Sequence, residues 1–376
     1  MTAVTEINKK PLSFICLSIL ILMLLFGLWP FNLNPVNHVF WLNEKPGVRF
    51  SGPGHLHTGG DLAGAFPGRS ISLEMGLRPA AEPNNRLPYI LSFWDGRRQE
   101  LFLIGQWKDS PAIRVRTSRP DVPRGYRERG KDQVLVKNRM VFITLTSSPE
   151  GTTLYVDGAM AKTFPGFPLL EDGPAGPSVL VLGNSAIGQS YWEGDLLGLA
   201  LYNRALSNRE VRENHSRWVR RDYSSLKNGL GLIGLYPFTE GQGNSVGNLA
   251  DGAHPLLKPA VFHPLQKVIL EWPTKEQLKR WSFYQDVAVN ILGFIPAGFF
   301  FALWLLRFTR LPFLRAGIVT LVLGSGISLG IELTQVYLPS RNSQASDLIF
   351  NILGTLIGLA LLGWAMKRKP TLINPV

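Results

Sequence analysis

Cysteine is almost absent from this chain of 376 residues. The single cysteine, Cys16, excludes an intrachain disulfide and leaves the redox compartment open. Its context, SFIC, lacks the small residues of a lipoprotein cleavage site, and the apolar run around it continues to Trp29 without an A-x-A-like signal-peptidase site. We therefore expect residues 11–29 to be an uncleaved membrane anchor.

Long apolar runs are missing between His38 and Asp286, where short alternating stretches are separated by glycine and proline. From Ile71 to Leu77 every second residue is apolar, which is the period of a half-buried strand. Similar stretches occur at 89–94, 101–107, 112–117, 140–146, 153–156, 179–182 and 194–202. Strands without intervening helices predict an antiparallel sandwich. One helix should follow it, because Ser207 and Glu210 form an S-x-x-E capping box.

Four apolar runs lie outside this region, at 11–29, 286–306, 316–337 and 347–366. Each is long enough to cross a hydrocarbon core of about 30 Å as a helix. With four spans, the basic tracts 9–10, 307–315 and 367–369 fall on one side, and by the positive-inside rule that side is the cytoplasm. We therefore expect a multi-pass protein of the cytoplasmic membrane with both termini cytoplasmic and the sandwich extracytoplasmic.

The predicted fold is multi-domain, an all-β jelly-roll sandwich plus a four-helix transmembrane bundle. The N-terminus and first helix occupy 1–37, the sandwich 38–265, an interfacial linker helix 266–285, and the other three helices 286–376. The linker helix is predicted from a capping box at Thr274 and Gln277 and from an aromatic belt that begins at Trp281.

The formal net charge of +12 is only a weak indication of anionic partners, and no nucleic-acid-binding motif accompanies it. Much of the sandwich's charge lies in 114–131, where prolines suggest a long loop that is either solvated or in contact with phosphate-bearing lipid or anionic glycan. Asp157 and Gly158 suit a hairpin turn, with a calcium role as the alternative.

Three stretches of the sandwich carry a family resemblance: TLYVDGAMAKTF, VLVLGNSA and YWEGDLLGLALYNRALSNREV. Together they resemble the closing strands of a LamG-like jelly roll of the concanavalin A-like lectin/glucanase class, over roughly 48–215. The resemblance implies a two-sheet sandwich whose relatives often bind carbohydrate or protein, sometimes with calcium. Residues 232–259 resemble the usual opening segment of such a domain, so we expect them to supply a late edge strand. No binding residue is assigned within the sandwich.

Seven polar residues interrupt or join the C-terminal apolar runs, and with four spans all of them belong to the outer end of the bundle. They are Asp286, Asn290, Glu332, Gln335, Arg341, Asp347 and Asn351. Their spacings place each helical pair on one side of its helix. Because a carboxylate facing lipid is costly, these sides should face the bundle interior, toward Arg341 or a ligand. We predict a ligand-binding site for a polar head whose tail stays in lipid. The alternative is a structural network in which Arg341 neutralises one carboxylate and the amides link helices.

The same residues, with Pro296, Gly298, Pro339, Gly354 and Gly358, are similar to the pattern of the VanZ-like membrane family over roughly 281–366. Residues 11–29 would be its first helix and the sandwich an insertion after it. The resemblance implies a small helical membrane protein whose named member is linked to teicoplanin resistance. It implies no reaction.

Three functions follow from these features. The favoured one is a non-catalytic envelope protein whose sandwich engages a glycan or envelope protein and whose bundle holds a membrane lipid or lipid-linked precursor, with no cofactor. The second is a membrane-embedded enzyme that uses Glu332 or Asp347 as general acid or base and Arg341 to stabilise a phosphate. The cluster lacks the histidine, cysteine and metal-ligand spacing that such chemistry often uses. The third is a transporter, which four spans could form only by oligomerising.

Overall fold

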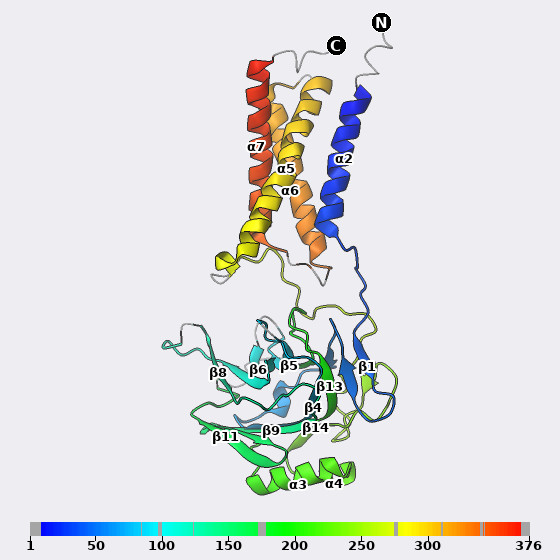
Figure 1. Ribbon diagram of the computed structural model, residues 1–376, viewed down its shortest axis with the longest axis vertical. Coiled ribbons are helices and arrows are strands. Elements are labelled where there is room, and N and C mark those ends of the chain that lie inside the picture. The colour runs from blue at the N-terminus through cyan, green and yellow to red at the C-terminus, as the bar shows by residue number, and fades with distance from the viewer. Residues whose placement is uncertain are drawn as a thin grey trace. The chain divides into compact units, whose positions relative to one another are not determined.

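The computed structural model of the protein describes residues 9–369 apart from 84, 97–99, 123, 172–177, 274–276, 310, 339–340 and 342. These residues form two compact units (Figure 1). One unit is the sandwich, Asn34–Gln266, and the other joins the chain up to Leu33 with the chain from Lys267 onward. Thr274, half of the predicted capping box, lies outside the described residues.

The sandwich consists of two antiparallel sheets, each with eight strands among the described residues. The first has the order β1-β2-β13-β4-β9-β10-β11, with β14 also beside β13. Its strands are β1 Val39–Trp41, β2 Val48–Phe50, β4 Ile71–Pro79, β9 Val141–Ser148, β10 Gly151–Val156, β11 Ala159–Pro165, β13 Gly194–Tyr202 and β14 Leu232–Tyr236. The predicted all-β sandwich is confirmed.

The second sheet has the order β15-β16-β3-β12-β5-β6-β7-β8. Its strands are β3 Leu56–Thr58, β5 Tyr89–Trp94, β6 Glu100–Trp107, β7 Ser110–Arg116, β8 Tyr126–Gly130, β12 Val179–Leu182, β15 Ser245–Val246 and β16 Leu256–Leu257. A short 3-10 helix, η1, covers Ala63–Ala65.

Strand β4 is buried on both faces, where its alternation predicted a half-buried strand. One face contributes Ile71 and Leu73 to the main core. The other side of this sheet carries a second apolar cluster that includes Trp218 of helix α3, Asn208–Val219 (Figure 1). The helix therefore covers polar positions that the sequence pattern assigned to solvent, and Glu74 is among the residues it buries.

The segment after α3 supplies a late edge strand, as the sequence predicted, and it also extends the second sheet. After the short helix α4, Tyr223–Lys227, strand β14 pairs with β13, and β15–β16 extend the second sheet beyond β3. The two ends of the sandwich are also tied together. Val36 forms an isolated bridge with Val261, and the Asn37 amide donates to the carbonyl oxygens of His55 and Pro259. Adjacent ends are what a domain inserted between two helices requires.

Two local predictions are confirmed. Helix α3 begins with the capping box, in which the Ser207 hydroxyl accepts from Glu210 N and the Glu210 carboxylate accepts from Ser207 N. Asp157 and Gly158 join β10 to β11 with φ of +50° and +78°, the left-handed pair of a tight hairpin turn. The Asp157 carboxylate accepts from Phe142 N at 2.9 Å, so it serves the strand beside the turn.

The basic segment 114–131 is not one long loop, so this prediction is wrong. Strands β7 and β8 pair there and form the edge of the second sheet. Arg114 lies opposite Glu128, forms an ion pair with it at 2.8 Å, and stacks over the Tyr126 ring. Opposite charges across two strands favour pairing, and the prolines fall between the strands, where they do not interrupt it.

The other unit contains four helices, among the described residues, that are long and apolar enough to cross a membrane. They are α2 Lys9–Leu28, α5 Trp281–Phe308, α6 Phe313–Gln335 and α7 Ala345–Arg368. Helices α5 and α7 pack closely: a Cβ on Gly298 would overlap the backbone oxygen of Thr355, and one on Gly354 that of Ile291.

The predicted linker helix of 266–285 differs from the structure. A 3-10 turn, η2 Gln277–Lys279, precedes α5, which already begins at Trp281 because no helix breaker separates it from Asp286. Around Glu271 the chain is instead extended beside the α6–α7 turn: Glu271 N donates to Ser343 O, and Ala345 N donates to Glu271 O. The aromatic belt is therefore the first turn of the second membrane-type helix.

Candidate functional site

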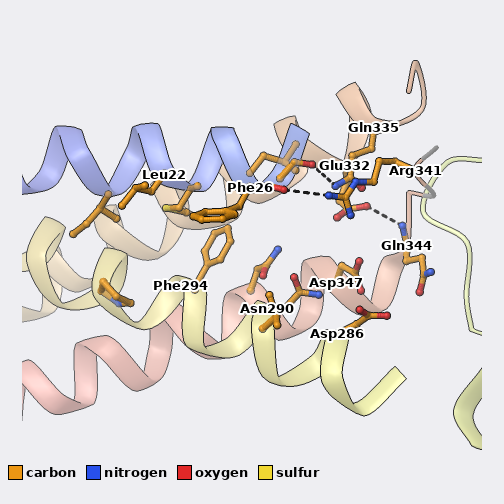
Figure 2. A pocket seen from close by; sticks show the side chains of 18 residues that line it. Leu22, Phe26, Asp286, Asn290, Phe294, Glu332, Gln335, Arg341, Gln344 and Asp347 are labelled. Atoms are coloured by element: carbon orange, nitrogen blue, oxygen red, sulfur yellow. Dashed lines mark hydrogen bonds between the residues drawn. The ribbon is translucent and has the colours of Figure 1, made fainter. Parts of the chain in front are cut away.

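One cavity of about 680 Å³ lies among helices α2, α5, α6 and α7 (Figure 2). All seven residues of the predicted site line it: Asp286, Asn290, Glu332, Gln335, Arg341, Asp347 and Asn351. They come together because α5 and α7 begin, and α6 ends, at the same end of the bundle (Figure 1). The i, i+3 and i, i+4 spacings then direct both members of each helical pair into the cavity.

Buried hydrogen bonds hold much of this polar end in place. Glu332 is 1% exposed, and its carboxylate accepts from the backbone N–H of Gln344 at 2.8 Å. The Gln335 amide donates to the carbonyl oxygen of Gly27 at 2.8 Å, which joins α6 to α2. The Asn351 amide donates to the Ser328 hydroxyl at 2.9 Å, which joins α7 to α6. Its own oxygen, Oδ1, is buried without a hydrogen-bond partner.

Among the described residues Arg341 forms no ion pair with a carboxylate, so the expected ion pair is wrong, although Arg341 interacts electrostatically with Asp347. The amides of Gln335 and Asn351 do link helices, as the structural alternative expects. The Arg341 Nε donates to Trp29 O at 2.9 Å and its Nη2 to Phe26 O at 3.3 Å. Within the described part of the chain, none of the ion pairs joins Arg341 to Glu332 or Asp347. The physical reason is the end of α2, whose last carbonyls have no partner within the helix and favour a cation beside them.

The opposite end of the cavity is apolar (Figure 2). The apolar residues of the cavity lining are Ile19, Leu22, Met23 and Phe26 of α2, Val289, Gly293, Phe294 and Pro296 of α5, and Ile331 of α6. The α2 residues are spaced i, i+3, i+4 and i+7, which is one face of a helix. This spacing was the sequence signal for α2's part in the site, and the prediction from polar residues missed it. The resulting cavity has the form that an amphipathic molecule needs.

The sandwich has a smaller cavity of about 460 Å³ over strands β5 to β8. It is lined by Tyr89, Glu100, Phe102, Leu103, Arg114, Arg116, Thr117, Ser118, Arg124, Gly125 and Tyr126. Burial raises the pKa of Tyr89 to about 12, and burial likewise raises the pKa of Glu100. The sequence assigned no binding residue here, because the pairing of β7 with β8, which assembles these side chains, was not predicted.

For a metal ion, the described residues offer no group of three or more His, Cys, Asp or Glu side chains that could hold it. This statement includes the three carboxylates of the bundle cavity, which line one space without converging on one point. We assign no residue of the described chain to calcium.

The fold and the cavity define a class of chain: four membrane-type helices, with a two-sheet sandwich inserted between the first and the second. Two family models match the two parts of this chain. Residues 55–212 match the family model of the concanavalin A-like lectin/glucanases superfamily, and residues 232–366 match the VanZ/LLP1 model. The chain therefore combines a VanZ-like helical segment with a LamG-like, concanavalin A-like domain. The VanZ/LLP1 match begins in β14, well before the predicted start near 281.

No curated protein matches the chain. Among solved structures, it is similar to the receptor-binding domain of botulinum neurotoxin C/D mosaic serotype, at 14% identity and a TM-score of 0.35, covering 49% of this chain and 44% of that one. It is similar to a putative carbohydrate binding protein from Bacteroides ovatus, at 13% identity and a TM-score of 0.38, covering 61% and 59%. A third is the CBM40 of a Ruminococcus gnavus IT-sialidase bound to α2,3-sialyllactose, at 15% identity and a TM-score of 0.35, covering 46% and 96%. The chain thus spans less than two thirds of the first two structures.

Proposed function

We propose that the protein is a non-catalytic membrane protein of the cell envelope whose bundle cavity holds the polar head of a lipid or lipid-linked precursor. The observation that carries this proposal is the division of one cavity into a polar and an apolar end. A head group at the end near Glu332 would leave its chain beside Met23 and Phe294, where apolar side chains replace lipid contacts. A volume of about 680 Å³ has room for a head group and the first part of a chain.

The membrane orientation belongs to the same proposal. The ends of the bundle nearest the two chain termini carry Lys10, Arg307 and Arg315, and the last helix ends at Arg368, so the positive-inside rule makes that end cytoplasmic. The polar end of the cavity and the sandwich are then extracytoplasmic. The protein is thus oriented to meet envelope lipids and glycans rather than cytoplasmic partners.

Impermeant thiol labelling tests this orientation. Arg124 is exposed on the sandwich, so Arg124→Cys in a Cys16→Ser background should be labelled in intact cells, or in spheroplasts where an outer membrane blocks access. The Cys16→Ser parent is the control and should stay unlabelled. Labelling of Arg124→Cys only after the cytoplasmic membrane is opened would reverse the orientation.

For the sandwich, we propose binding of a glycan or an envelope protein. Its support is the match to the concanavalin A-like lectin/glucanases model together with the cavity over β5 to β8, which presents tyrosines and arginines to a partner. Tyr126→Ala should weaken retention of purified cell-wall glycan, whereas a change at exposed Met140, outside the cavity, should not. A link to teicoplanin-type glycopeptide resistance or to exopolysaccharide biology is a further part of the proposal, supported by the VanZ-like match alone.

The enzymatic alternative receives less support from the geometry. Two of the Arg341 nitrogens that would stabilise a phosphate donate to the backbone of α2 instead. Glu332 is held by a backbone N–H and is 1% exposed, so it has little room to exchange protons with a reacting group.

Near-isosteric variants test the binding proposal. Glu332→Gln and Asp347→Asn should leave the detergent-solubilised chain folded and reduce the amount of lipid that copurifies with it, because each removes a charge from the cavity and little volume. Glu44→Gln, at an exposed position of the sandwich, is the matched control. If both cavity variants are folded and carry as much lipid as the control, the proposed site is wrong.

A further inference from the structure

The polar end of the cavity has few donors left for a ligand. Arg341 uses Nε and Nη2 on the carbonyl oxygens of Trp29 and Phe26, and Gln335 uses its amide nitrogen on Gly27 O. A backbone carbonyl can only accept, so in each of these pairs the side-chain nitrogen must face the backbone of α2. Two of the strongest donors of the cavity lining therefore stabilise the position of α2.

Acceptors, by contrast, are only partly satisfied by the protein: Gln344 N donates to Glu332, and the Ser346 hydroxyl donates to Asp347. The carboxyl groups of Asp286, Glu332 and Asp347 line the cavity, and only donors can satisfy their oxygens when they are ionised. Asn351 gives an independent sign of a missing partner. It lines the same cavity, is 4% exposed, and its Oδ1 is buried with no donor. A buried acceptor without a donor destabilises the folded chain, and a ligand that donates to it would remove that cost.

The charged side chains that line the cavity also indicate a cationic ligand. Three carboxyl groups and one guanidinium line the cavity, and that guanidinium already caps a helix. Carboxylates at membrane depth are costly unless paired, so the missing complement is a cation. A metal ion does not fit, because the described residues contain no cluster of three or more ligands for it. An ammonium group fits both needs, since it carries a positive charge and donates up to three hydrogen bonds that a carboxylate strengthens.

We infer that the cavity selects a head group bearing an ammonium with N–H donors. This inference rests on the proposed function and adds the chemical class of the ligand. The ammonium comes either from an amine-headed phospholipid or from an amine on a lipid-linked precursor, and both offer the same group to the carboxylates. Heads that carry only hydroxyl groups lack the charge, and a quaternary ammonium lacks the N–H donors.

Competition among three phospholipids with identical chains tests the inference. The full chain is exchanged into micelles with equal amounts of phosphatidylethanolamine, phosphatidylcholine and phosphatidylglycerol, and native mass spectrometry measures the lipid that each protein molecule retains. All three share the phosphate, so only the terminal group differs. We expect phosphatidylethanolamine to be retained at least roughly tenfold over either competitor, the cost of leaving a donor or acceptor unpaired.

Charge reversal at the cavity is the matching variant. Asp286 is exposed at the start of α5, so Asp286→Lys should fold, and its own ammonium should abolish the preference for phosphatidylethanolamine. Glu44→Lys makes the same change on the exposed sandwich surface and should leave the preference intact. If Asp286→Lys fails to fold, Asp347→Asn replaces it, with the expectation that the preference falls.

The outcomes separate the two proposals. Equal retention of the three lipids, or equal retention of phosphatidylglycerol and phosphatidylethanolamine, overturns the inference while a lipid is still held. Retention of no lipid overturns the proposed function as well. Where phosphatidylethanolamine is preferred, adding soluble O-phosphoethanolamine shows which part of the lipid the cavity requires. Displacement of the lipid means that the ammonium head alone is enough, and no displacement means that the acyl chains are also required.

Discussion

Two buried carboxylates, Glu74 in the sandwich and Glu332 in the bundle, have opposite surroundings. Glu74 is 0% exposed and accepts from Trp218 Nε1 and Asn214 Nδ2 at 3.0 Å each and from the Tyr202 hydroxyl at 3.3 Å. Glu332 is almost equally buried, but it accepts from the backbone N–H of Gln344, hydrogen-bonds with the Ser343 side chain and borders a cavity.

The two regions satisfy their buried polar groups in different ways. In the sandwich, β4, β13 and α3 supply every partner of Glu74, so this network fixes the helix on the sheet without any ligand. In the bundle, the donors of Arg341 and Gln335 are used on the backbone at the end of α2, and among the described residues Asn351 Oδ1, beside the cavity, has no hydrogen-bond partner. Burial alone therefore does not distinguish the two carboxylates, whereas the cavity beside Glu332 does.

The sandwich should fold without the helices, and a truncation within it should change its stability most. Residues 34–266, expressed alone, should unfold cooperatively. Ending the chain at Asp222 removes the fully buried side chains of Leu235, Tyr236 and Phe238 and exposes the edge of β13. Each such side chain contributes about 1.5–3 kcal/mol, so the shorter chain should not fold stably. Equal melting temperatures for the two chains would show that β14 to β16 contribute little.

A smaller effect is expected from pH, because the environment of Glu74 predicts that the stability of the sandwich depends on it. Burial raises the pKa of Glu74 from 4.5 to about 7, although its hydrogen bonds lower it. The folded state therefore binds the proton more tightly than the unfolded state, so its stabilising effect is complete below pH 4.5 and is lost as the pH rises to about 7. The free energy of unfolding of the sandwich should fall by about 3 kcal/mol across this range.

Glu74→Gln supplies the control for this prediction, because it keeps the shape of the protonated acid and cannot ionise. Urea unfolding of both proteins at pH 4.5 and pH 8 measures the effect. The variant should lose less stability than the wild type between these values. A pH dependence as steep in Glu74→Gln as in the wild type would assign the titration to other groups.

A smaller effect is expected where Arg341 fastens α2. Arg341→Ala should cost about 1–3 kcal/mol, because it removes charge-assisted hydrogen bonds to Trp29 O and Phe26 O. Cys16 reports the loosening, since its thiol lies on α2 and donates to Phe300 O of α5. Alkylation of Cys16 by a membrane-permeant maleimide should become faster in Arg341→Ala and stay unchanged in Arg315→Ala, which alters an exposed arginine of α6. Equal rates in the two variants would mean that Arg341 does not hold α2.

Much of the architecture was predictable because its signals are local. Alternating apolar residues indicated the strands, the Ser207–Glu210 box the start of α3, and long apolar runs the four helices. The gathering of seven polar residues followed from spacing and from the antiparallel order of helices. The β7–β8 hairpin was missed because its stability depends on cross-strand pairs such as Arg114 and Glu128, which only a register brings together.

Partners of buried groups were the least predictable. Glu74 sits at a position of β4 that alternation assigns to solvent, and its burial depends on where α3 lies. Arg341 was expected beside a carboxylate because opposite charges attract, yet the unpaired carbonyls at the end of α2 are nearer partners. In both cases the decisive contact joins elements far apart in sequence, which no local pattern records.

Filling the bundle cavity with a larger side chain tests whether a lipid occupies it. Gly293 lines the cavity, and a Cβ atom there would meet no neighbour within 4 Å, so Gly293→Leu should fill the space without disturbing the helices. Gly326→Leu makes the same change at an equally open position outside the cavity lining. Native mass spectrometry of the purified full chain should find bound lipid in the wild type and in Gly326→Leu and little in Gly293→Leu. The same lipid occupancy in all three proteins would contradict the claim that a lipid occupies the cavity.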